Sequence, residues 1–517
     1  MSHDDAPLPG PDFALGVPLA SIPEDGVLAG HVGDAAVLLV RLDDGVHAVG
    51  AHCTHYGAPL SEGRFADGQV HCPWHHACFD LRSGEPDCAP AFAPLGRWRT
   101  EVVDDIVHVR EPMSAAPAST SARSSGANVP RRVVIVGGGA AGYAAARRLR
   151  EHGFDGTVSM LSADADAPVD RPNLSKDFLA GTAQPEWLPL QDAADYAAQD
   201  IDLRLGCDVA SLDTRAREVV TRTGERIGYD ALLLATGAEP RRLALPGFDR
   251  PHVHVLRTLA DANAIVAAAG QARSVAFIGA GFIGLEAAAA LRSRGLEVSV
   301  VAPGAVPMAR ILGDALGNAL TAMHRAHGVE FHLGRKPARL DGNTLVLDDG
   351  SQVDADLVIV GIGVEPRTGL AEAAGLQVDN GILVDARLQT SMPGIHAAGD
   401  VARYPHAGER VRVEHWVHAQ RQGQCVADNI LAGGGLAGGG PGSGRDFTDV
   451  PFFWTHQYDL ELRVSGHLAG WDDARIEGSP GSGDFIVRYY RAGKLVAAAT
   501  AGRDRLNLEI EAALAAA

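Results

Sequence analysis

The sequence predicts a multidomain protein with a small all-β domain first, two α/β domains of the strand–helix–strand type next, and a small α+β domain last. Three observations predict this order. Short apolar runs punctuated by glycine, proline and aspartate fill residues 12–112. Strand and helix patterns alternate in two similar stretches after residue 130, and strand-like runs followed by one helix end the chain. With 517 residues, the chain is too long for one core.

Composition and charge exclude several classes of protein. Apolar residues make up 46% and charged residues 21%, which is typical of a globular protein. The formal net charge of −19 argues against binding to nucleic acid or to an anionic membrane. No uncharged apolar run reaches the ~18 residues that span a bilayer, and the acidic residues 1–5 do not resemble a signal peptide. We therefore expect a cytoplasmic protein that binds neither nucleic acid nor membrane.

The N-terminal domain carries two short clusters that each offer one thiol and one imidazole. Cys53 precedes His55, Cys72 precedes His75, and sixteen residues separate the clusters. Two cysteines on one iron and two histidines on the other are the ligands of a Rieske [2Fe–2S] centre. A Cys2His2 zinc site is the alternative, but zinc fingers place cysteines together and histidines together. The sequence thus predicts a Rieske domain over residues 12–112, with strands at 36–41, 46–49, 69–71 and 106–110.

Other histidines and cysteines of this domain fall outside the ligand pattern. His52, His71 and His76 are expected as loop residues near a surface that meets a partner. Cys78 and Cys88 could form a disulfide brace, but position 58, which carries a cysteine in the respiratory-type Rieske loop, is alanine here, so both are expected as reduced thiols. Residues 113–129 are rich in alanine, serine and proline, which predicts a flexible linker.

The first glycine-rich motif joins a strand to a helix. A strand is expected at 132–136, Gly137, Gly139 and Gly142 follow it, and a helix is expected at 140–152 before a strand at 157–161. Glycines there permit a tight turn and close approach of a pyrophosphate to the helix N-terminus. An acid about 20 residues on, Asp164 with Asp166 as the alternative, is placed to bind a ribose hydroxyl.

The second motif has the same context but lacks the acid. Gly279, Gly281 and Gly284 lie between a strand expected at 274–278 and a helix expected at 282–294. The following strand, 297–301, is succeeded by Ala302, and no arginine immediately replaces the missing carboxylate. NADH is therefore the expected nucleotide, with NADPH left open.

Two further segments indicate FAD. Residues 232–237 end a strand at a glycine turn, and residues 394–400 form a short strand that delivers Asp400. Between and after two dinucleotide motifs, these segments fit a chain that wraps around FAD. A glycine-rich stretch at 433–444 marks the next boundary, after which strands are expected at 485–490 and 495–500 and a helix at 506–516.

On these motifs, residues 130–517 resemble the FAD-dependent pyridine-nucleotide reductases that serve Rieske oxygenases and bacterial P450s. Residues 12–112 resemble the Rieske ferredoxins which such reductases reduce. The fusion resembles apoptosis-inducing-factor-like proteins with an N-terminal Rieske domain. The resemblance implies two Rossmann-like α/β domains for FAD and NAD and a C-terminal reductase domain. The domain boundaries that it implies are 130–256 and 379–440 for the FAD domain, 257–378 for the NAD domain and 446–517 for the C-terminal domain.

The resemblance also implies roles for individual residues. Residues 171–176 match the family segment R-P-x-L-S-K, whose lysine lies beside the isoalloxazine, so Lys176 and Trp454 are the expected catalytic residues, with burial in the C-terminal core as the alternative for Trp454. Cys207 and Cys425 are expected in cores, because no redox-active C-x-x-C is present. The residues expected to bind FAD or the nicotinamide nucleotide are Gly137, Gly139, Gly142, Asp164, Arg171, Lys176, Val209, Ala235, Gly237, Arg241, Gly279, Gly281, Gly284, Glu286, Gly363, Gly399, Asp400, Glu414, His415 and Trp416.

The sequence thus predicts an electron-transfer oxidoreductase. NAD(P)H would reduce FAD, whose electrons would pass singly to the Rieske cluster and on to an external acceptor protein such as an oxygenase or a P450. The alternative is a redox-switched binding or signalling protein of apoptosis-inducing-factor type with low turnover. A Rieske oxygenase would need a 2-His-1-carboxylate iron site, for which His324 and His327 are poor candidates within flavoprotein-like sequence. Monomer and homodimer both stay open.

Overall fold

The computed structural model describes residues 9–24, 26–114, 130–433 and 444–517. Their contacts divide them into two compact units, and each unit is described by itself. The first contains Met1–Ser125, Arg147–Phe154 and Asp504–Ala517, and the second contains Gly126–Ala146 and Asp155–Arg503. Residues 115–129, which make up nearly all of the expected linker, and residues 434–443 of the glycine-rich stretch lie outside the described residues.

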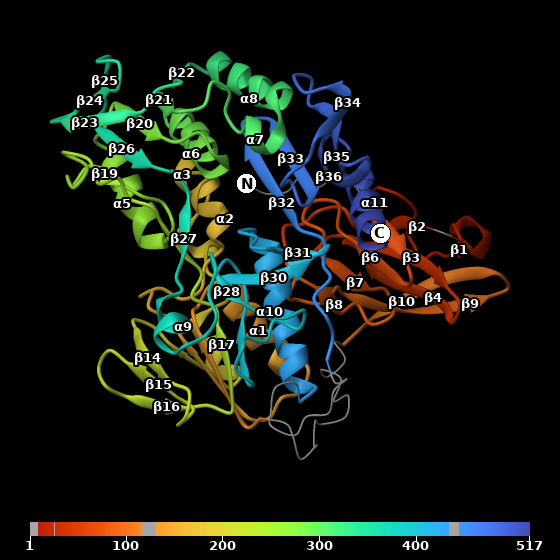
Figure 1. Cartoon of the computed structure of the whole chain (residues 1–517). Helices are drawn as coiled ribbons and strands as arrows, with labels where there is room; N and C mark the ends of the chain where they lie inside the picture. Colours follow the sequence, from red (N-terminus) through yellow and green to blue (C-terminus); the bar gives the residue numbers. More distant parts are fainter. Residues whose placement is uncertain (1–8, 25, 115–129, 434–443) are drawn as a thin grey trace. The chain divides into compact units, whose positions relative to one another are not determined.

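The first unit contains two antiparallel sheets and confirms the expected all-β domain (Figure 1). The six-stranded sheet has the order β1-β10-β9-β4-β3-β2, and the four-stranded sheet has the order β5-β6-β7-β8. Leu38, Val49, Val70 and Phe79 belong to one of its apolar cores. The strands are β1 (Val17–Pro18), β2 (Val27–Val32), β3 (Ala35–Leu42), β4 (Gly45–Gly50), β5 (Arg64–Ala66), β6 (Gln69–His71), β7 (Cys78–Asp80), β8 (Pro86–Cys88), β9 (Arg97–Val103) and β10 (Ile106–Met113). Short 3-10 turns are η1 (Leu19–Ser21) and η2 (Leu60–Glu62).

One expectation about this unit is wrong. Cys78 and Cys88 form a disulfide rather than two reduced thiols. Strands β7 and β8 are antiparallel, and their register places Cys78 directly opposite Cys88, with 5.1 Å between the Cα atoms. That separation lies in the range that a disulfide spans. A count of cysteines could not reveal this pairing, because it depends on the register of two short strands.

His76 also differs from its expected place at the surface. Its side chain is fully buried, its backbone has φ of 60°, and its Nδ1 atom contacts the Glu511 carboxylate. Glu511 lies on helix α11 (Asp504–Ala515), which belongs to the first unit by its contacts. His52, by contrast, is exposed as expected.

The second unit begins with a five-stranded parallel sheet of order β13-β12-β11-β17-β29. Strand β11 (Arg132–Val136) lies at its centre between β12 (Thr157–Leu161) and β17 (Ala231–Leu234), with β13 (Ile201–Arg204) and β29 (Ile395–Ala397) at the edges. Apolar β-branched and leucine residues fill the central strands, as burial on both faces requires. Helix α1 (Ala140–Glu151) follows β11 and confirms the first strand–glycine–helix unit.

A second parallel sheet repeats this pattern with the order β19-β26-β20-β21-β22. Helix α6 (Phe282–Ser293) follows the central strand β20 (Ser274–Ile278), and β21 (Glu297–Ala302) follows α6. Strand β19 (Val253–His254) pairs with β26, so this sheet starts four residues before the expected boundary at residue 257. Its other elements are α5 (Leu259–Ala269), α7 (Ala309–Leu312), α8 (Asp314–Ala326), β22 (Val329–Leu333) and β26 (Leu357–Val360).

The C-terminal sheet is antiparallel and confirms the expected β-rich end of the chain. Its order is β32-β33-β36-β35-β34, with bounds β32 (Phe452–Gln457), β33 (Leu460–Gly466), β34 (Asp473–Ser479), β35 (Asp484–Arg491) and β36 (Lys494–Ala501). Helix α10 (Trp416–Leu431) is buried along most of its length. Among the helices of the described residues, none is long and apolar enough to cross a bilayer.

Shorter elements connect these layers. They are α2 (Arg171–Leu174), α3 (Asp177–Ala180), η3 (Pro185–Trp187), α4 (Ala193–Ala198), β14 (Val209–Asp213), β15 (Glu218–Thr221), β16 (Arg226–Gly228), β18 (Ala238–Pro240), β23 (Pro337–Asp341), β24 (Thr344–Leu347), β25 (Gln352–Asp354), β27 (Val364–Pro366), α9 (Gly369–Ala373), β28 (Ile382–Leu383), β30 (Ala402–His406) and β31 (Glu409–Val411).

Candidate functional site

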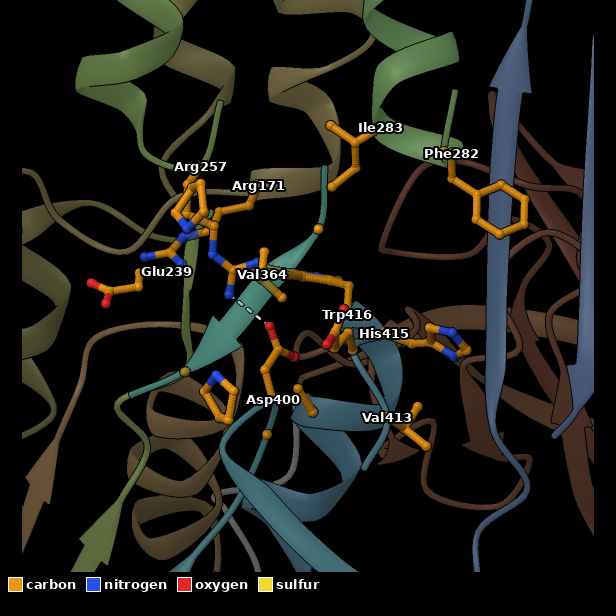
Figure 2. A pocket seen from close by; sticks show the side chains of 18 of the residues that line it. Arg171, Glu239, Arg257, Phe282, Ile283, Val364, Asp400, Val413, His415 and Trp416 are labelled. Atoms are coloured by element: carbon orange, nitrogen blue, oxygen red, sulfur yellow. Dashed lines mark hydrogen bonds and ion pairs between the residues drawn. The ribbon is translucent and has the colours of Figure 1, made fainter. Parts of the chain in front are cut away.

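A cavity of about 1760 Å³ lies in the second unit, and both glycine-rich motifs contribute to its wall. Its lining comes from the carboxyl ends of parallel strands in the two sheets, the edge at which open α/β sheets bind ligands. Figure 2 shows part of this wall, with Arg171, Arg257, Asp400 and His415 among the labelled side chains. Ligand pockets in proteins usually measure about 300–1000 Å³, so this cavity has room for more than one ligand.

The first glycine motif has the shape of a dinucleotide cradle. Gly137 has φ of +118°, and a Cβ atom there would lie 2.1 Å from the Ala235 carbonyl oxygen. A Cβ atom on Gly142 would lie 2.0 Å from the Gly137 carbonyl oxygen, so Gly142 lets the helix pack against the turn. At Gly139 a Cβ atom would point into open space on the cavity side. A pyrophosphate at the N-terminus of α1 fits that space.

Two arginine–carboxylate pairs lie in the cavity wall. Arg171 Nη2 donates to Asp164 Oδ2 at 2.8 Å, and Arg257 Nη2 donates to Asp400 Oδ2 at 2.6 Å, as Figure 2 shows for the second pair. Burial lowers the pKa of Arg171, with the nearby Arg257 adding to the effect. Asp164 lines both this cavity and an adjoining small hollow, whereas Asp166 lines the hollow alone.

Arg257 lines the cavity but is not among the site residues expected from the sequence. The side chain follows the short strand β19 and reaches a carboxylate that lies 143 positions further along the chain. The signal that could have found it is its place just after the carboxyl end of a parallel strand. A strand of two residues is too short to be recognised from apolar periodicity.

The expected catalytic residues come together around a buried ion pair. Lys176 Nζ lies 2.9 Å from Glu286 Oε2 and 6.0 Å from the centre of the Trp454 ring. The hydroxyl of Ser175 also donates to Glu286 Oε2, at 2.6 Å. Glu286 is 4% exposed, so its charge is held by these two donors. Trp454 lines the cavity and is only partly buried, which argues against the alternative of a core tryptophan.

The second glycine motif repeats the cradle on the other sheet. Gly279 has φ of +112°, and a Cβ atom there would lie 2.2 Å from the Gly361 carbonyl oxygen. Gly281 faces open space on the cavity side, as Gly139 does. Gly284 and Gly363 also line the cavity, and so does Ala302 at the end of β21.

Aromatic and polar groups at the start of α10 line a further part of the wall. Glu414, His415 and Trp416 all contribute, and the ring of His415 lies 4.5 Å from that of Phe453. Burial lowers the pKa of His415 to about 4, so the imidazole is neutral at pH 7. Glu414 Oε1 pairs with Arg412 Nη1 at 2.7 Å.

The cavity collects most of the expected cofactor-binding residues but not all. Gly142, Gly279 and Arg241 do not line it; the two glycines serve packing, and Arg241 donates to the carbonyl of Val364 at 3.3 Å. Cys425 is buried as expected, and burial raises its pKa to about 12. Cys207 is not in a core. It follows strand β13 and lines the cavity, because a residue after the carboxyl end of a parallel strand reaches this edge.

The four candidate metal ligands of the first unit come together as two pairs. The Nδ1 atoms of His55 and His75 lie 3.1 Å apart, and the thiols of Cys53 and Cys72 are hydrogen-bonded to each other. Within the described residues no group of three or more His, Cys, Asp or Glu side chains forms a site for a single ion. Two cysteines and two histidines are the donor set of a Rieske [2Fe–2S] cluster, with the cysteines on one iron and the histidines on the other.

The environment favours the iron-binding forms of His55 and Cys53, whereas the hydrogen bond to Cys53 and burial raise the pKa of the Cys72 thiol. Burial lowers the pKa of His55 to about 3, which keeps the imidazole neutral. The hydrogen bond from the Cys72 thiol lowers the pKa of Cys53. Tyr56 is 45% exposed, and its ring packs edge-on against both His55 and His75. The distances between ring centres are 4.4 Å to His55 and 5.5 Å to His75.

The histidines considered for an oxygenase iron site have other contacts. His324 is buried and its Nε2 atom lies 2.8 Å from Gln457 Oε1, while His327 stacks on Tyr458 with 3.7 Å between ring centres. Both histidine side chains therefore pack between α8 and the end of β32 with the turn that follows it.

Comparison with known families identifies three regions. Residues 131–423 match the pyridine nucleotide-disulphide oxidoreductase family, residues 17–101 match the Rieske [2Fe-2S] domain, and residues 452–516 match the reductase C-terminal family. The first match covers more than half of the chain. These domains carry FAD with NAD(P)H and a [2Fe–2S] cluster, and the donor groups described above fit both.

Individual relatives include both fused and unfused proteins. The chain is 33% identical to apoptosis-inducing factor 3 of Homo sapiens over 503 residues, covering 94% of this chain and 81% of the relative. It is 37% identical to rhodocoxin reductase of Rhodococcus erythropolis, and the match covers 74% of this chain and 89% of that reductase. Among solved structures, the covalent putidaredoxin reductase–putidaredoxin complex is 33% identical over 74% of this chain and 93% of that one, with a TM-score of 0.69.

Proposed function

The chain belongs to the pyridine nucleotide-disulphide oxidoreductase family, and we propose that it passes electrons from NAD(P)H through FAD to its own Rieske cluster and on to an external acceptor protein. It is an NAD(P)H-dependent oxidoreductase. The observation that carries the proposal is the presence of both sets of donors in one chain: two dinucleotide cradles on one cavity, and two ligand pairs for a [2Fe–2S] cluster.

FAD supplies the conversion of a two-electron hydride donor into single electrons. The residues of this chain bind and orient it. Gly137 and Gly139 leave room for the pyrophosphate, Asp164 would accept from the adenosine ribose, and Arg171 would neutralise phosphate charge. Asp400, held by Arg257, would accept from the sugar alcohol chain of the cofactor.

The buried pair of Lys176 and Glu286 would fix the reacting face of the cavity. Lys176 places a cation beside Trp454, and Glu286 holds that cation in one position through a 2.9 Å contact. A fixed ammonium group favours negative charge that develops on a bound ring system. Hydride transfer needs no general acid or base, so these residues act by orientation and electrostatics.

The Rieske domain would accept electrons one at a time through Cys53, His55, Cys72 and His75. Neutral imidazoles raise the potential of such a cluster above that of an all-cysteine cluster, so a flavin can reduce it. Because one chain carries both modules, the cluster stays at high effective concentration near its donor. The acceptor we propose is an oxygenase or P450 component, since relatives include the reductase of an anthranilate 1,2-dioxygenase system. A cytoplasmic location is part of the proposal.

The second candidate is a redox-switched binding or signalling protein with low turnover. It is favoured by the similarity to apoptosis-inducing factor 3, which extends over 94% of this chain. A switch would keep its nucleotide bound for long periods and pass electrons slowly to any acceptor. An electron carrier would turn over an added one-electron acceptor, such as cytochrome c, many times per second.

The variant Cys72→Ser separates the two halves of the proposed pathway. Loss of one thiolate ligand should abolish the Rieske electron paramagnetic resonance signal, while NAD(P)H should still bleach the flavin within about two-fold of the normal rate. Loss of the Rieske signal together with loss of flavin bleaching would contradict the proposal that the flavin accepts hydride independently of the cluster. His52→Ala is the matched control, because His52 is an exposed imidazole beside Cys53 and lies outside the ligand pairs. Iron analysis and flavin content show whether each variant is loaded.

A further inference from the structure

Among the described residues, strand β21 beside the second glycine motif ends without the carboxylate that such units use to bind the adenosine ribose. Strand β21 ends at Ala302, which is 5% exposed and lines the cavity. In dinucleotide-binding units of this type, an acid at the end of that strand accepts hydrogen bonds from the ribose 2′-hydroxyl and repels a 2′-phosphate. Alanine neither accepts the hydroxyl nor repels the phosphate.

The segment after β21 supplies no substitute acid. Residues 303–309 are Pro-Gly-Ala-Val-Pro-Met-Ala, and all seven line the cavity. Glu286, the carboxylate of helix α6 in the same wall, is already held by Lys176 and Ser175. Asp314, in the first turn of α8, is the next acid along the chain that lines the cavity.

A cation lies on the same segment. Arg310, on α7, is exposed and lines the cavity. Within the described ranges Arg310 has no ion-pair partner. Arg335 is also close to the end of β21, since its backbone N–H donates to the carbonyl of Ala302 at 3.1 Å. Its guanidinium, however, is held by Asp349 at 2.8 Å and does not line the cavity.

From this arrangement we infer that the electron donor is NADPH rather than NADH, and that Arg310 binds the 2′-phosphate. The inference rests on the proposed function, because it names the nucleotide of the same site, and it reverses the preference expected from sequence. An arginine near this strand end is the usual means of holding a 2′-phosphate. The planar, charged guanidinium of Arg310 carries N–H donors whose arrangement matches the oxygen atoms of a phosphate group. Ala302 leaves the position free of the opposing charge.

The test uses adenosine fragments, so that binding is read without turnover. Isothermal titration of the FAD-loaded full-length protein compares adenosine 2′,5′-bisphosphate with 5′-AMP. The bisphosphate should bind at least ten-fold more tightly, which corresponds to about 1.4 kcal/mol. Arg310→Gln should remove most of that difference by weakening the bisphosphate alone. Arg335→Gln is the matched control and should change neither affinity by more than about two-fold.

A second variant restores the missing carboxylate. Ala302→Glu should favour 5′-AMP over the bisphosphate, and should lower the ratio of kcat/KM for NADPH to that for NADH by at least ten-fold. Equal or tighter binding of 5′-AMP by the unaltered protein would overturn the inference. An equal loss of both ligands in Arg310→Gln would overturn the role of Arg310. If neither NADPH nor NADH produced the Rieske signal, the proposed function would be contradicted, while the fragment titration would still decide the preference.

Discussion

The two glycine-rich motifs occupy equivalent places in two parallel sheets, yet only the first has a carboxylate shortly after the neighbouring strand. Each motif follows a central strand, and each has one glycine, Gly139 or Gly281, that faces open space in the cavity. The first motif is completed by Asp164, which accepts from Arg171 at 2.8 Å. The corresponding strand of the second sheet ends at Ala302.

This difference separates two tasks that one fold performs. The cradle that admits a pyrophosphate is a property of the backbone, so glycine at a few positions is sufficient in both motifs. The choice between ribose and ribose phosphate depends on one side chain at the strand end. The same strand–glycine–helix architecture can therefore bind both FAD, which stays in place, and a nicotinamide nucleotide, which exchanges. The side chain at the end of the neighbouring strand differs between the two sites.

The largest expected effect comes from filling the two cradles one at a time. Gly139→Ala should give protein that folds but holds at least about ten-fold less FAD, because the added methyl group enters ligand space and meets no protein atom. Gly281→Ala should retain FAD and raise KM for the nicotinamide nucleotide by about ten-fold. Flavin absorbance per protein and steady-state kinetics measure the two effects. FAD loss in both variants would show that the motifs do not hold different ligands.

The next effect concerns the ion pair between the two motifs. Lys176→Met removes the ammonium group and leaves the buried Glu286 carboxylate with only the Ser175 hydroxyl, which should lower the free energy of unfolding by about 3 kcal/mol. The rate at which the nucleotide bleaches the flavin should also fall. Ser175→Ala, which removes the neutral donor alone, should cost about 1 kcal/mol. Denaturant melts and stopped-flow absorbance provide both values, and similar losses in the two variants would argue against a special role of the lysine.

Asp164→Ala removes the carboxylate that the first motif has beside it and the second motif lacks. FAD affinity should fall by about ten-fold, because a ribose acceptor is lost and Arg171 loses its 2.8 Å partner. Asp166→Ala is the control, since Asp166 lines only the adjoining hollow and not the large cavity. If the control loses as much FAD as the test variant, the ribose acid is not Asp164.

The effect that is smallest at neutral pH is a pH dependence of stability, which appears only in acid. His396 on β29 is 1% exposed, and burial lowers its pKa to about 4 from an ordinary value of 6.5. Between those values the unfolded chain binds a proton that the folded chain does not, so stability is lost as the pH falls from about 6.5 to about 4. Urea unfolding over this range should show a shallower dependence in His396→Gln. An unchanged slope would assign the loss to other buried histidines.

Much of the fold could be predicted because its signals are local. A buried strand, a glycine turn and an amphipathic helix occupy about thirty consecutive residues, and both such units lie where the sequence predicts them. The mixed Cys–His clusters are likewise readable from spacing, and their side chains come together in pairs.

What could not be predicted depends on register and on distant contacts. The Cys78–Cys88 disulfide follows from the pairing of two three-residue strands, and the burial of His76 follows from a helix that lies 435 positions away. Arg257 reaches Asp400 across 143 positions. Cys207 has an ordinary sequence context, and only its place after a parallel strand brings it to the cavity.

An anaerobic titration of the full-length protein with NADPH, and in parallel with NADH, tests the electron pathway most directly. Flavin absorbance and the electron paramagnetic resonance signal of the cluster are followed together. We expect the flavin to bleach first and a Rieske signal then to grow toward one spin per chain, at lower concentrations of NADPH than of NADH. Complete bleaching with no Rieske signal would contradict the internal pathway and favour the redox-switched protein.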